Sequence, residues 1–350
     1  MPFFAMISPV PTPVRGVRVP HQEREILVSG ANISPRIGER YHGRYEHSRR
    51  AIGGNDLSRY SVVDVGSNTI HLLVGEVDGG EVLPVTGEKF SARLGAGVEK
   101  TGRLEQERLL LAAEAINFFA RIAALNGAPS PEVLATSAVR DAENGPELVE
   151  RVRETTGLKM RLISGKKEAE LGFRGALSAL GGRREGKVLV VDLGGGSAQL
   201  IFGEASGVVE ERVSLPLGTN RTTERFVRTN PPTDGELGAL GEHVAGLLPA
   251  WDIGDAPVVA VGGSARAMVK ITQDDLTAGR LWRLSEEIRK WPSGVLAREH
   301  GLTPERARVL PAAITTLATV LEVFGKEELT VARGGIREGT LLALAEGGQV

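Results

Sequence analysis

Cysteine is absent from this chain of 350 residues, which excludes disulfides, thiolate metal sites and cysteine nucleophiles. Aromatic residues make up only 4%, and the formal net charge of −2 gives no global basic field for nucleic acid. No apolar run approaches the roughly 18 residues of a membrane span. Five prolines within the first 20 residues exclude the apolar region of a signal peptide. We predict a cytoplasmic enzyme or binding protein without a nucleic-acid or membrane partner.

The length and the hydrophobic content of 41% are sufficient for two domains with their own cores. Residues 1–59 differ from the rest, because nine arginines and five acids give this segment a local net charge of 9 − 5 = +4. Proline, glycine and polar residues break up any apolar periodicity in it. We interpret it as a disordered leader, or as a start codon placed too early; a basic arm for an anionic partner is the alternative.

From residue 60 the sequence predicts two runs of the order strand-strand-strand-helix-strand-helix-strand-helix. For the first run we expect strands at 61–65, 70–77, 81–94, 133–135 and 159–163, and helices at 104–125, 146–156 and 167–180. For the second we expect strands at 187–192, 198–202, 208–215, 257–261 and 329–332, and helices at 219–228, 234–248, 264–271, 276–298, 304–324 and 337–346.

The two runs resemble each other residue by residue. A shift of 128 positions (192 − 64) places Asp64 on Asp192 and gives seven identities within the fifteen positions 62–76. We therefore predict an internal duplication, with domain I at 60–182 and domain II at 183–350. Whether the last helix packs back on domain I is left open.

Each repeat carries an aspartate at the end of its first strand, directly followed by a tight turn. The turns contain Gly66, Ser67, Asn68 and Thr69 in the first repeat, and Gly194, Gly195, Gly196 and Ser197 in the second. Glycine lets backbone N–H groups converge on an anion, and the hydroxyl and amide side chains add further partners. An aspartate beside bound phosphate needs a cation between them, so Asp64 and Asp192 suggest Mg²⁺ or another divalent ion. A plain glycine hairpin is the alternative for either turn taken alone.

Five motifs occur in an order that resembles the Ppx/GppA phosphatase family. They are Asp-x-Gly-Ser-Asn-Thr-x-His (64–71), Ala-Thr-Ser-Ala-x-Arg-x-Ala-x-Asn (135–144), Ile-Ser-Gly-x-x-Glu-Ala (163–169), Asp-Leu-Gly-Gly-Gly-Ser (192–197) and Arg-Gly-Gly-x-Arg-Glu-Gly (333–339). The resemblance covers residues 60–346. It implies an α/β fold of two duplicated actin-like (ribonuclease H-like) domains, as in the actin/sugar kinase/Hsp70 ATPase superfamily, with an interdomain cleft.

The resemblance also implies hydrolysis of a terminal phosphoanhydride of inorganic polyphosphate or guanosine pentaphosphate, assisted by Mg²⁺. Glu168 matches the family's catalytic glutamate, and a carboxylate within reach of a water can accept its proton. Arg93 resembles the family arginine that meets phosphate, and a surface salt bridge is the alternative for it. A solvated residue in the first turn of a helix is the alternative for Glu168.

Secondary candidates are Arg140 and Asn144 in the second motif, Arg337 at the start of the last helix, and Gly262, Gly263 and Ser264, which align with the adenosine turn of related kinases. For His71 a structural role is the preferred interpretation. Longer family members carry a C-terminal His-Asp domain that this sequence does not show, so we expect short polyphosphates to be favoured. A homodimer is left open.

Four functions remain in competition. An exopolyphosphatase is preferred over a guanosine pentaphosphate 5′-phosphatase, because few aromatic residues lie near the motifs to stack a guanine. A kinase would place an aspartate base beside a sugar hydroxyl and would need an adenosine pocket. A non-catalytic sensor of guanosine tetraphosphate would keep the two turns and would not require Glu168.

Overall fold

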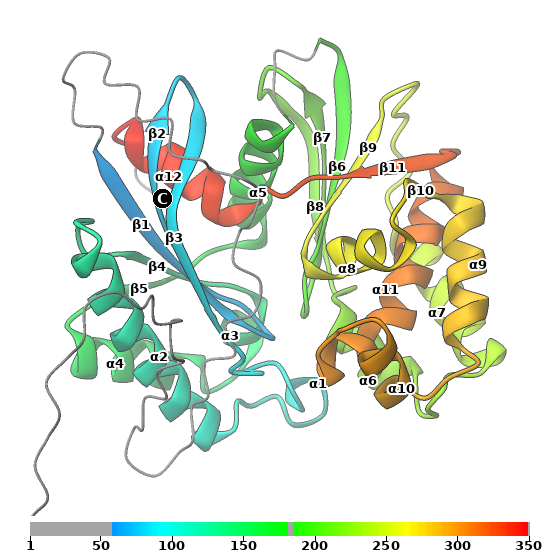
Figure 1. Cartoon of the computed structure of the whole chain (residues 1–350), viewed down its shortest axis with the longest axis horizontal. Coiled ribbons are helices and arrows are strands. Elements are labelled where there is room, and N and C mark those ends of the chain that lie inside the picture. The colour runs from blue at the N-terminus through cyan, green and yellow to red at the C-terminus, as the bar shows by residue number, and fades with distance from the viewer. Residues whose placement is uncertain (1–57, 181–184, 349–350) are drawn as a thin grey trace, which may run out of the picture. The chain divides into compact units, whose positions relative to one another are not determined.

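Two β-sheets with helices on both faces make up the described part of the chain in a computed structural model (Figure 1). The structure describes residues 58–180 and 185–348, all within one compact unit, His47–Val350. The predicted leader lies outside the described residues except for its last two positions. The first strand begins at Arg59, two residues earlier than predicted, and the guanidinium Nε of Arg59 lies 2.9 Å from Oε1 of Glu76.

The two sheets have the same topology. The first contains β1 (Arg59–Val65), β2 (Ile70–Asp78), β3 (Glu81–Phe90), β4 (Glu132–Ala135) and β5 (Met160–Leu162), in the order β3-β2-β1-β4-β5. The second contains β6 (Lys187–Leu193), β7 (Ala198–Glu204), β8 (Val209–Leu215), β9 (Val258–Val261), β10 (Leu276–Thr277) and β11 (Glu328–Val331), in the order β10-β11-β9-β6-β7-β8. Read from β8, the second order is β8-β7-β6-β9-β11 followed by β10. Its first five strands match the order of the first sheet. This confirms the predicted duplicated α/β fold.

The strand register repeats as closely as the order. Asp64 pairs with His71 on the neighbouring strand, and Asp192 pairs with Gln199, so both pairs differ by the same 128 positions (192 − 64 and 199 − 71). The β2–β3 pairing shifts register between Val74 and Gly75, and the β7–β8 pairing shifts between Phe202 and Gly203, again 128 positions apart (202 − 74). Bulges at equivalent sites are conformational details that unrelated hairpins would not share.

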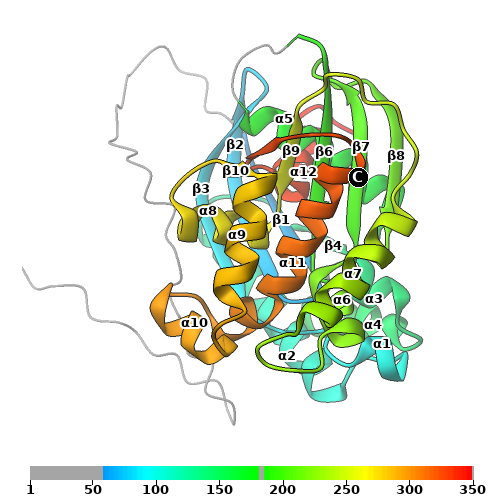
Figure 2. The same ribbon diagram turned by 90° about the vertical axis from the view of Figure 1, so that its right-hand side faces the viewer.

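Helices cover both sheets (Figures 1 and 2). On the outer face of the first sheet the core is closed mainly by α2 (Gln106–Leu125) and α4 (Gly145–Thr156), and on the outer face of the second mainly by α7 (Asp234–Leu247), α9 (Ala278–Ile288) and α11 (Pro304–Val323). None of the helices in the described part of the chain combines the length and the apolar character needed to cross a bilayer. The helices are α1 (Val98–Thr101), α2 (Gln106–Leu125), α3 (Ser137–Asp141), α4 (Gly145–Thr156), α5 (Gly165–Ala179), α6 (Thr219–Phe226), α7 (Asp234–Leu247), α8 (Gly263–Thr272), α9 (Ala278–Ile288), α10 (Ser293–Glu299), α11 (Pro304–Val323) and α12 (Ile336–Ala345).

Some predicted elements were wrong in extent. The helix predicted at 276–298 is the strand β10 followed by two helices, because the Thr277 side chain caps α9 and Pro292 precedes α10. Proline removes a backbone donor and disfavours the helical conformation of the residue before it, which separates the two helices. The third strand ends at Phe90 instead of residue 94, and Arg93 has a left-handed φ of 51°. The short helices α1 and α3 were not predicted.

Strand alternation places both motif aspartates between the two sheets. Val63 and Val65 belong to the outer core of the first sheet and Val62 to an inner cluster, so Asp64 extends from the inner face. By the same parity Asp192 shares the inner face of its sheet with Val190. The inner faces are covered by α5 and α12, which explains why these strands are apolar on both sides.

The two inner helices cross each other in direct backbone contact. α5 packs mainly on the second sheet, although Leu171 joins the cluster of the first sheet. α12 packs on the first sheet, so the two helices lie side by side between the sheets (Figure 1). A Cβ atom at Gly175 would lie 1.8 Å from the carbonyl oxygen of Gly335, and one at Gly339 would lie 1.9 Å from that of Leu171. Only glycine fits these positions. The close crossing brings the first turns of both helices to the space between the aspartates.

Candidate active site

The two acid-led turns meet at one end of a cavity of about 150 Å³. Each turn is closed by an equivalent hydrogen bond, from Gly66 N to Thr69 O (3.2 Å) and from Gly194 N to Ser197 O (3.0 Å). The turns also touch one another, because a Cβ atom at Gly195 would lie only 3.1 Å from Cβ of Ser67. The two turns therefore lie in contact, with the cavity beside them.

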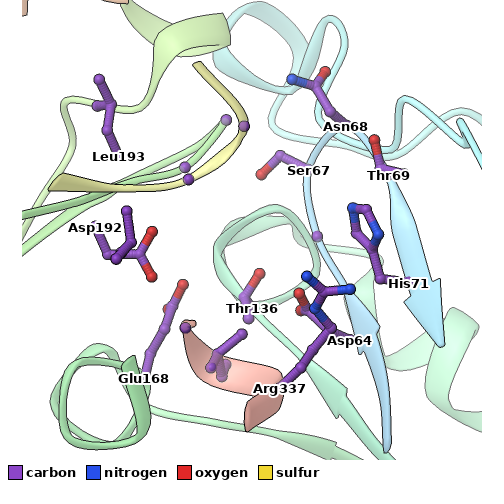
Figure 3. Close-up of a pocket in the computed structure, with 18 of the residues that line it drawn as sticks. Asp64, Ser67, Asn68, Thr69, His71, Thr136, Glu168, Asp192, Leu193 and Arg337 are labelled. Atoms are coloured by element: carbon purple, nitrogen blue, oxygen red, sulfur yellow. The ribbon is translucent and has the colours of Figure 1, made fainter. Parts of the chain in front are cut away.

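Four carboxylates line this cavity. They belong to Asp64, Glu168, Asp192 and Glu338, which come from β1, α5, β6 and α12. Asp192 and Glu168 point into the cavity from one side, and Asp64 lies across from them near Arg337 (Figure 3). Burial raises the pKa of Asp64 to about 7 and that of Asp192 to about 6; Arg337 opposes the first and Arg266 the second. The charge of Asp192 also raises the pKa of Asp64, so the two acids repel each other when both are ionised.

These acids fit a divalent cation. Carboxylate oxygens are the protein ligands that Mg²⁺ prefers. A cation bound by Asp64 and Asp192 would offset the cost of burying their charges and the repulsion between them, which are the two causes that raise their pKa values. Within the described ranges no group of three or more His, Asp or Glu side chains is arranged as a ready-made metal cage. Mg²⁺ in proteins usually takes one or two carboxylates and shares its other positions with water and substrate phosphates.

Glu168 lies in the first turn of α5, which Ser164 caps by accepting a hydrogen bond from Lys167 N. Its side chain is only 11% exposed, and Oε2 accepts a 3.1 Å hydrogen bond from Nη1 of Arg140. Burial raises the pKa of Glu168 to about 7, although Arg140 opposes the rise. A carboxylate with a pKa near neutrality is suited to accept a proton from water.

Arg140 therefore acts on Glu168 and does not line the cavity, where it was a candidate for binding phosphate. Its Nη1 also donates to the carbonyl oxygen of Ile163 (2.9 Å), which fixes the guanidinium beside the glutamate. We expect Arg140→Gln to raise the pKa of Glu168, so that the rising limb of the pH–rate profile moves to higher pH. Turnover should fall about fivefold at pH 7 and recover near pH 9. Loss of activity by the same factor at every pH would contradict this role.

Four arginines form the cationic part of the lining: Arg266, Arg306, Arg333 and Arg337. Only Arg337 was a sequence candidate. Arg306 donates from Nη1 to Oγ of Ser264 (2.7 Å), and a Cβ atom at Gly263 would lie 2.4 Å from Nη2 of Arg306. The predicted Gly262-Gly263-Ser264 turn thus positions an arginine against the cavity, with both glycines in the lining and Ser264 buried behind them. Guanidinium groups suit phosphate because their donors bind two oxygens at once.

Other predicted residues lie elsewhere. Asn144 is buried, accepts a hydrogen bond from Leu104 N (2.8 Å) and donates one to Leu104 O (3.0 Å), so it fixes a loop. Arg93 is exposed outside the lining, and its N–H donates to Asn68 O (2.9 Å). Gly196 does not line the cavity either, whereas Gly66, Ser67, Asn68, Thr69, Gly194, Gly195 and Ser197 do.

His71 lines the cavity beside Asp64 on the neighbouring strand (Figure 3). Burial first, and then the charges of Arg337 and other cations, hold its pKa well below the usual range, so the ring is neutral. The equivalent residue in the second repeat is Gln199, which donates from Nε2 to Oγ of Ser197 (2.8 Å). Sequence reasoning missed Gln199, as well as Thr136 and Ser137 of the lining, although the shift of 128 positions (199 − 71) would have located Gln199.

Comparison with known proteins identifies the family. The model of the Ppx/GppA phosphatase family matches residues 73–346. Exopolyphosphatase 1 of Mycobacterium tuberculosis is 30% identical over 305 residues, which cover 81% of this chain and 87% of that protein. The guanosine-5′-triphosphate,3′-diphosphate pyrophosphatase of Aliivibrio fischeri is 27% identical over 290 residues, which cover 80% of this chain and 58% of that protein.

The fold agrees with this assignment. The crystal structure of the Ppx/GppA family member from Aquifex aeolicus superposes with a TM-score of 0.71 at 26% identity, over 84% of this chain and 100% of that one. An exopolyphosphatase from Cytophaga hutchinsonii, at 22% identity, shares the fold with a TM-score of 0.75 over 83% of this chain and 99% of that one. The chain belongs to the Ppx/GppA phosphatase family, as its motifs predicted.

Proposed function

We propose that this chain releases terminal orthophosphate from inorganic polyphosphate, with short chains favoured, through attack of a water molecule that Glu168 activates. The observation that carries the proposal is the joint lining of one cavity by two acid-led turns, a nearly buried glutamate of pKa about 7 and four arginines. Water is a poor nucleophile, and a buried carboxylate can orient it and accept its proton. The turns and the arginines supply donors to the transferred phosphoryl group.

Asp64 and Asp192 would hold Mg²⁺, which when bound neutralises charge on the phosphate oxygens. Ser67, Asn68 and Thr69 on one side and Gly194, Gly195 and Ser197 on the other would bind successive phosphates. The two turns touch where Gly195 faces Ser67, so the phosphates that they bind would lie in the adjoining cavity.

The lining also supports polyphosphate over a guanine nucleotide. Among the described residues that line the cavity there is no Phe, Tyr or Trp to stack a base. Guanosine pentaphosphate 5′-phosphatase remains the alternative, because relatives named exopolyphosphatase and relatives named pyrophosphatase for that nucleotide both match the chain. A non-catalytic sensor of guanosine tetraphosphate would use the same turns without needing Glu168.

The test is orthophosphate release from tripolyphosphate, long-chain polyphosphate and guanosine pentaphosphate, each with Mg²⁺ and at equal concentrations of terminal phosphate. We expect the highest kcat/KM for tripolyphosphate. A higher value for guanosine pentaphosphate would favour the alternative enzyme, and tight binding of guanosine tetraphosphate without any release would favour the sensor. Transfer of phosphate from ATP to a sugar would instead indicate a kinase.

A further inference from the structure

The second glycine turn is supported from behind by the first residues of α6. The carbonyl oxygen of Gly194 accepts from Thr219 N (2.9 Å), and that of Gly195 accepts from Asn220 N (2.8 Å). The packing leaves no room, since a Cβ atom at Gly218 would lie 2.2 Å from the carbonyl carbon of Gly196. The start of α6 therefore sets the orientation of the first two peptide groups of the turn.

Arg221 sets the third peptide group with its side chain. Its Nε donates to the carbonyl oxygen of Gly196 at 3.0 Å. In a trans peptide the N–H points opposite to the C=O of the same unit. With three successive carbonyls bound to α6 and Arg221, the N–H groups of Gly195, Gly196 and Ser197 point away from α6. Gly195 and Ser197 line the cavity, so this orientation makes the turn an anion-binding backbone.

The same guanidinium reaches across to domain I. Its Nη2 donates to Oδ2 of Asp141 (2.7 Å), and its Nη1 lies 3.0 Å from Oε2 of Glu99. The Arg221 side chain is 24% exposed, so both ion pairs are partly shielded from water. Two neighbouring hydrogen bonds also connect α6 to domain I. Nδ2 of Asn220 donates to Oδ1 of Asn68 at 2.6 Å, and Oε1 of Glu224 accepts from Gly97 N at 3.2 Å.

We propose that Arg221 is a positioning residue that couples closure of the two domains to the orientation of the second phosphate turn. Three donors of one planar group hold the turn carbonyl and two carboxylates of the other domain, an arrangement that a lysine cannot reproduce. With Asp141 and Glu99 in place, the guanidinium is fixed and the Ser197 N–H stays aimed away from α6. Without them, a single bond to Gly196 holds that peptide. This inference rests on the proposed function, because the turn is taken to bind phosphate.

Two variants separate the parts of this coupling. Glu99→Gln with Asp141→Asn removes the charges of domain I and keeps the bond to Gly196, whereas Arg221→Ala removes both. Arg103→Ala is the matched control, because Arg103 also pairs with two carboxylates, Glu143 and Glu147, but within domain I. All variants are compared by thermal unfolding, and Arg221→Lys is included so that a folding defect in Arg221→Ala does not decide the result.

We expect the double variant to raise KM about two- to tenfold with a smaller effect on kcat, because it weakens closure and also removes the 3.4 Å pair of Asp141 with Nε of Arg140. Arg221→Ala and Arg221→Lys should also lower kcat, with kcat/KM falling about tenfold to 100-fold, as for loss of a hydrogen bond to a charged group. Arg103→Ala should remain within about twofold of the wild type. The proposal is overturned if folded Arg221→Lys keeps the wild-type kcat, or if the double variant loses as much kcat as Arg221→Ala.

Closure is measured independently of activity. Because the chain contains no cysteine, Glu114→Cys on α2 and Glu242→Cys on α7, both at exposed positions, accept a dye pair that reports the distance between the domains. Titration with the non-hydrolysable analogue imidodiphosphate and Mg²⁺ should close Arg221→Ala only at higher concentration than the wild type or Arg103→Ala. Equal titration midpoints for Arg221→Ala and the wild type would overturn the proposed role of Arg221 in closure. Absence of phosphate release by the wild type would instead refute the proposed function, and the distance measurement would still test Arg221.

Discussion

Glu168→Gln is expected to lower kcat at least about 100-fold on polyphosphate while binding is retained. Glutamine keeps the volume of the side chain and can still accept the hydrogen bond from Arg140, which lies 3.1 Å from Oε2 in the wild type. It cannot take a proton from water. Steady-state release of orthophosphate from tripolyphosphate gives kcat, and calorimetric titration with imidodiphosphate gives the affinity.

Glu170→Gln is the matched control, because Glu170 lies on the same helix two residues later and pairs with Arg212 at 3.2 Å outside the cavity lining. We expect it to turn over at the wild-type rate. Near-normal kcat in Glu168→Gln would remove this glutamate from the mechanism. Weak binding of the analogue together with low activity would point to a structural role for Glu168 instead of a general base.

The sequence was sufficient to place the two turns because their signal is duplicated. Asp64 and Asp192 are each the last residue but one of an apolar strand that a glycine follows, and the strand period of two fixes which face of the sheet each acid occupies. A cavity between two similar domains then follows from the covered inner faces. The glycines of the last motif also had a physical reason that the sequence alone could not give. Gly339 lets α12 cross α5 in backbone contact, as the 1.9 Å clash of an added Cβ with Leu171 shows.

The arginines were harder to predict, because each comes from a different element and none repeats. Arg306 is at the third position of α11, far in sequence from the turn that it approaches, and only the packing of Gly263 against its guanidinium brings them together. Asn144, in contrast, was predicted as a site residue and does not line the cavity. It lies within a motif of the family, yet both ends of its amide bind the backbone of Leu104. Membership of a motif therefore did not separate residues that line the cavity from residues that hold its walls.

Asp192→Asn is expected to have opposite effects on activity and on the stability of the metal-free protein. Activity should fall about 100-fold or more, since the substitution removes one of two carboxylates proposed to hold Mg²⁺. In EDTA at pH 8, however, the melting temperature should rise. The folded-state pKa of Asp192 is about 6, raised from 3.8 chiefly by burial, so the folded protein binds this proton more tightly than the unfolded chain does. Stability is then lost as pH rises from about 4 through 6.

Asparagine cannot ionise and so avoids this loss, which we expect to stabilise the variant by about 1–3 kcal/mol at pH 8 and hardly at all at pH 4. It also removes the charge that raises the pKa values of Asp64 and Glu168. Adding Mg²⁺ at pH 8 should raise the melting temperature of the wild type, because the ion binds the folded site, and should raise that of the variant much less. Asp78→Asn, at an exposed strand end, should leave all of these values unchanged. If Asp192→Asn melts at a lower temperature than the wild type in EDTA, Asp192 does not destabilise the metal-free protein. If the variant keeps the full Mg²⁺ effect, Asp192 does not bind the ion.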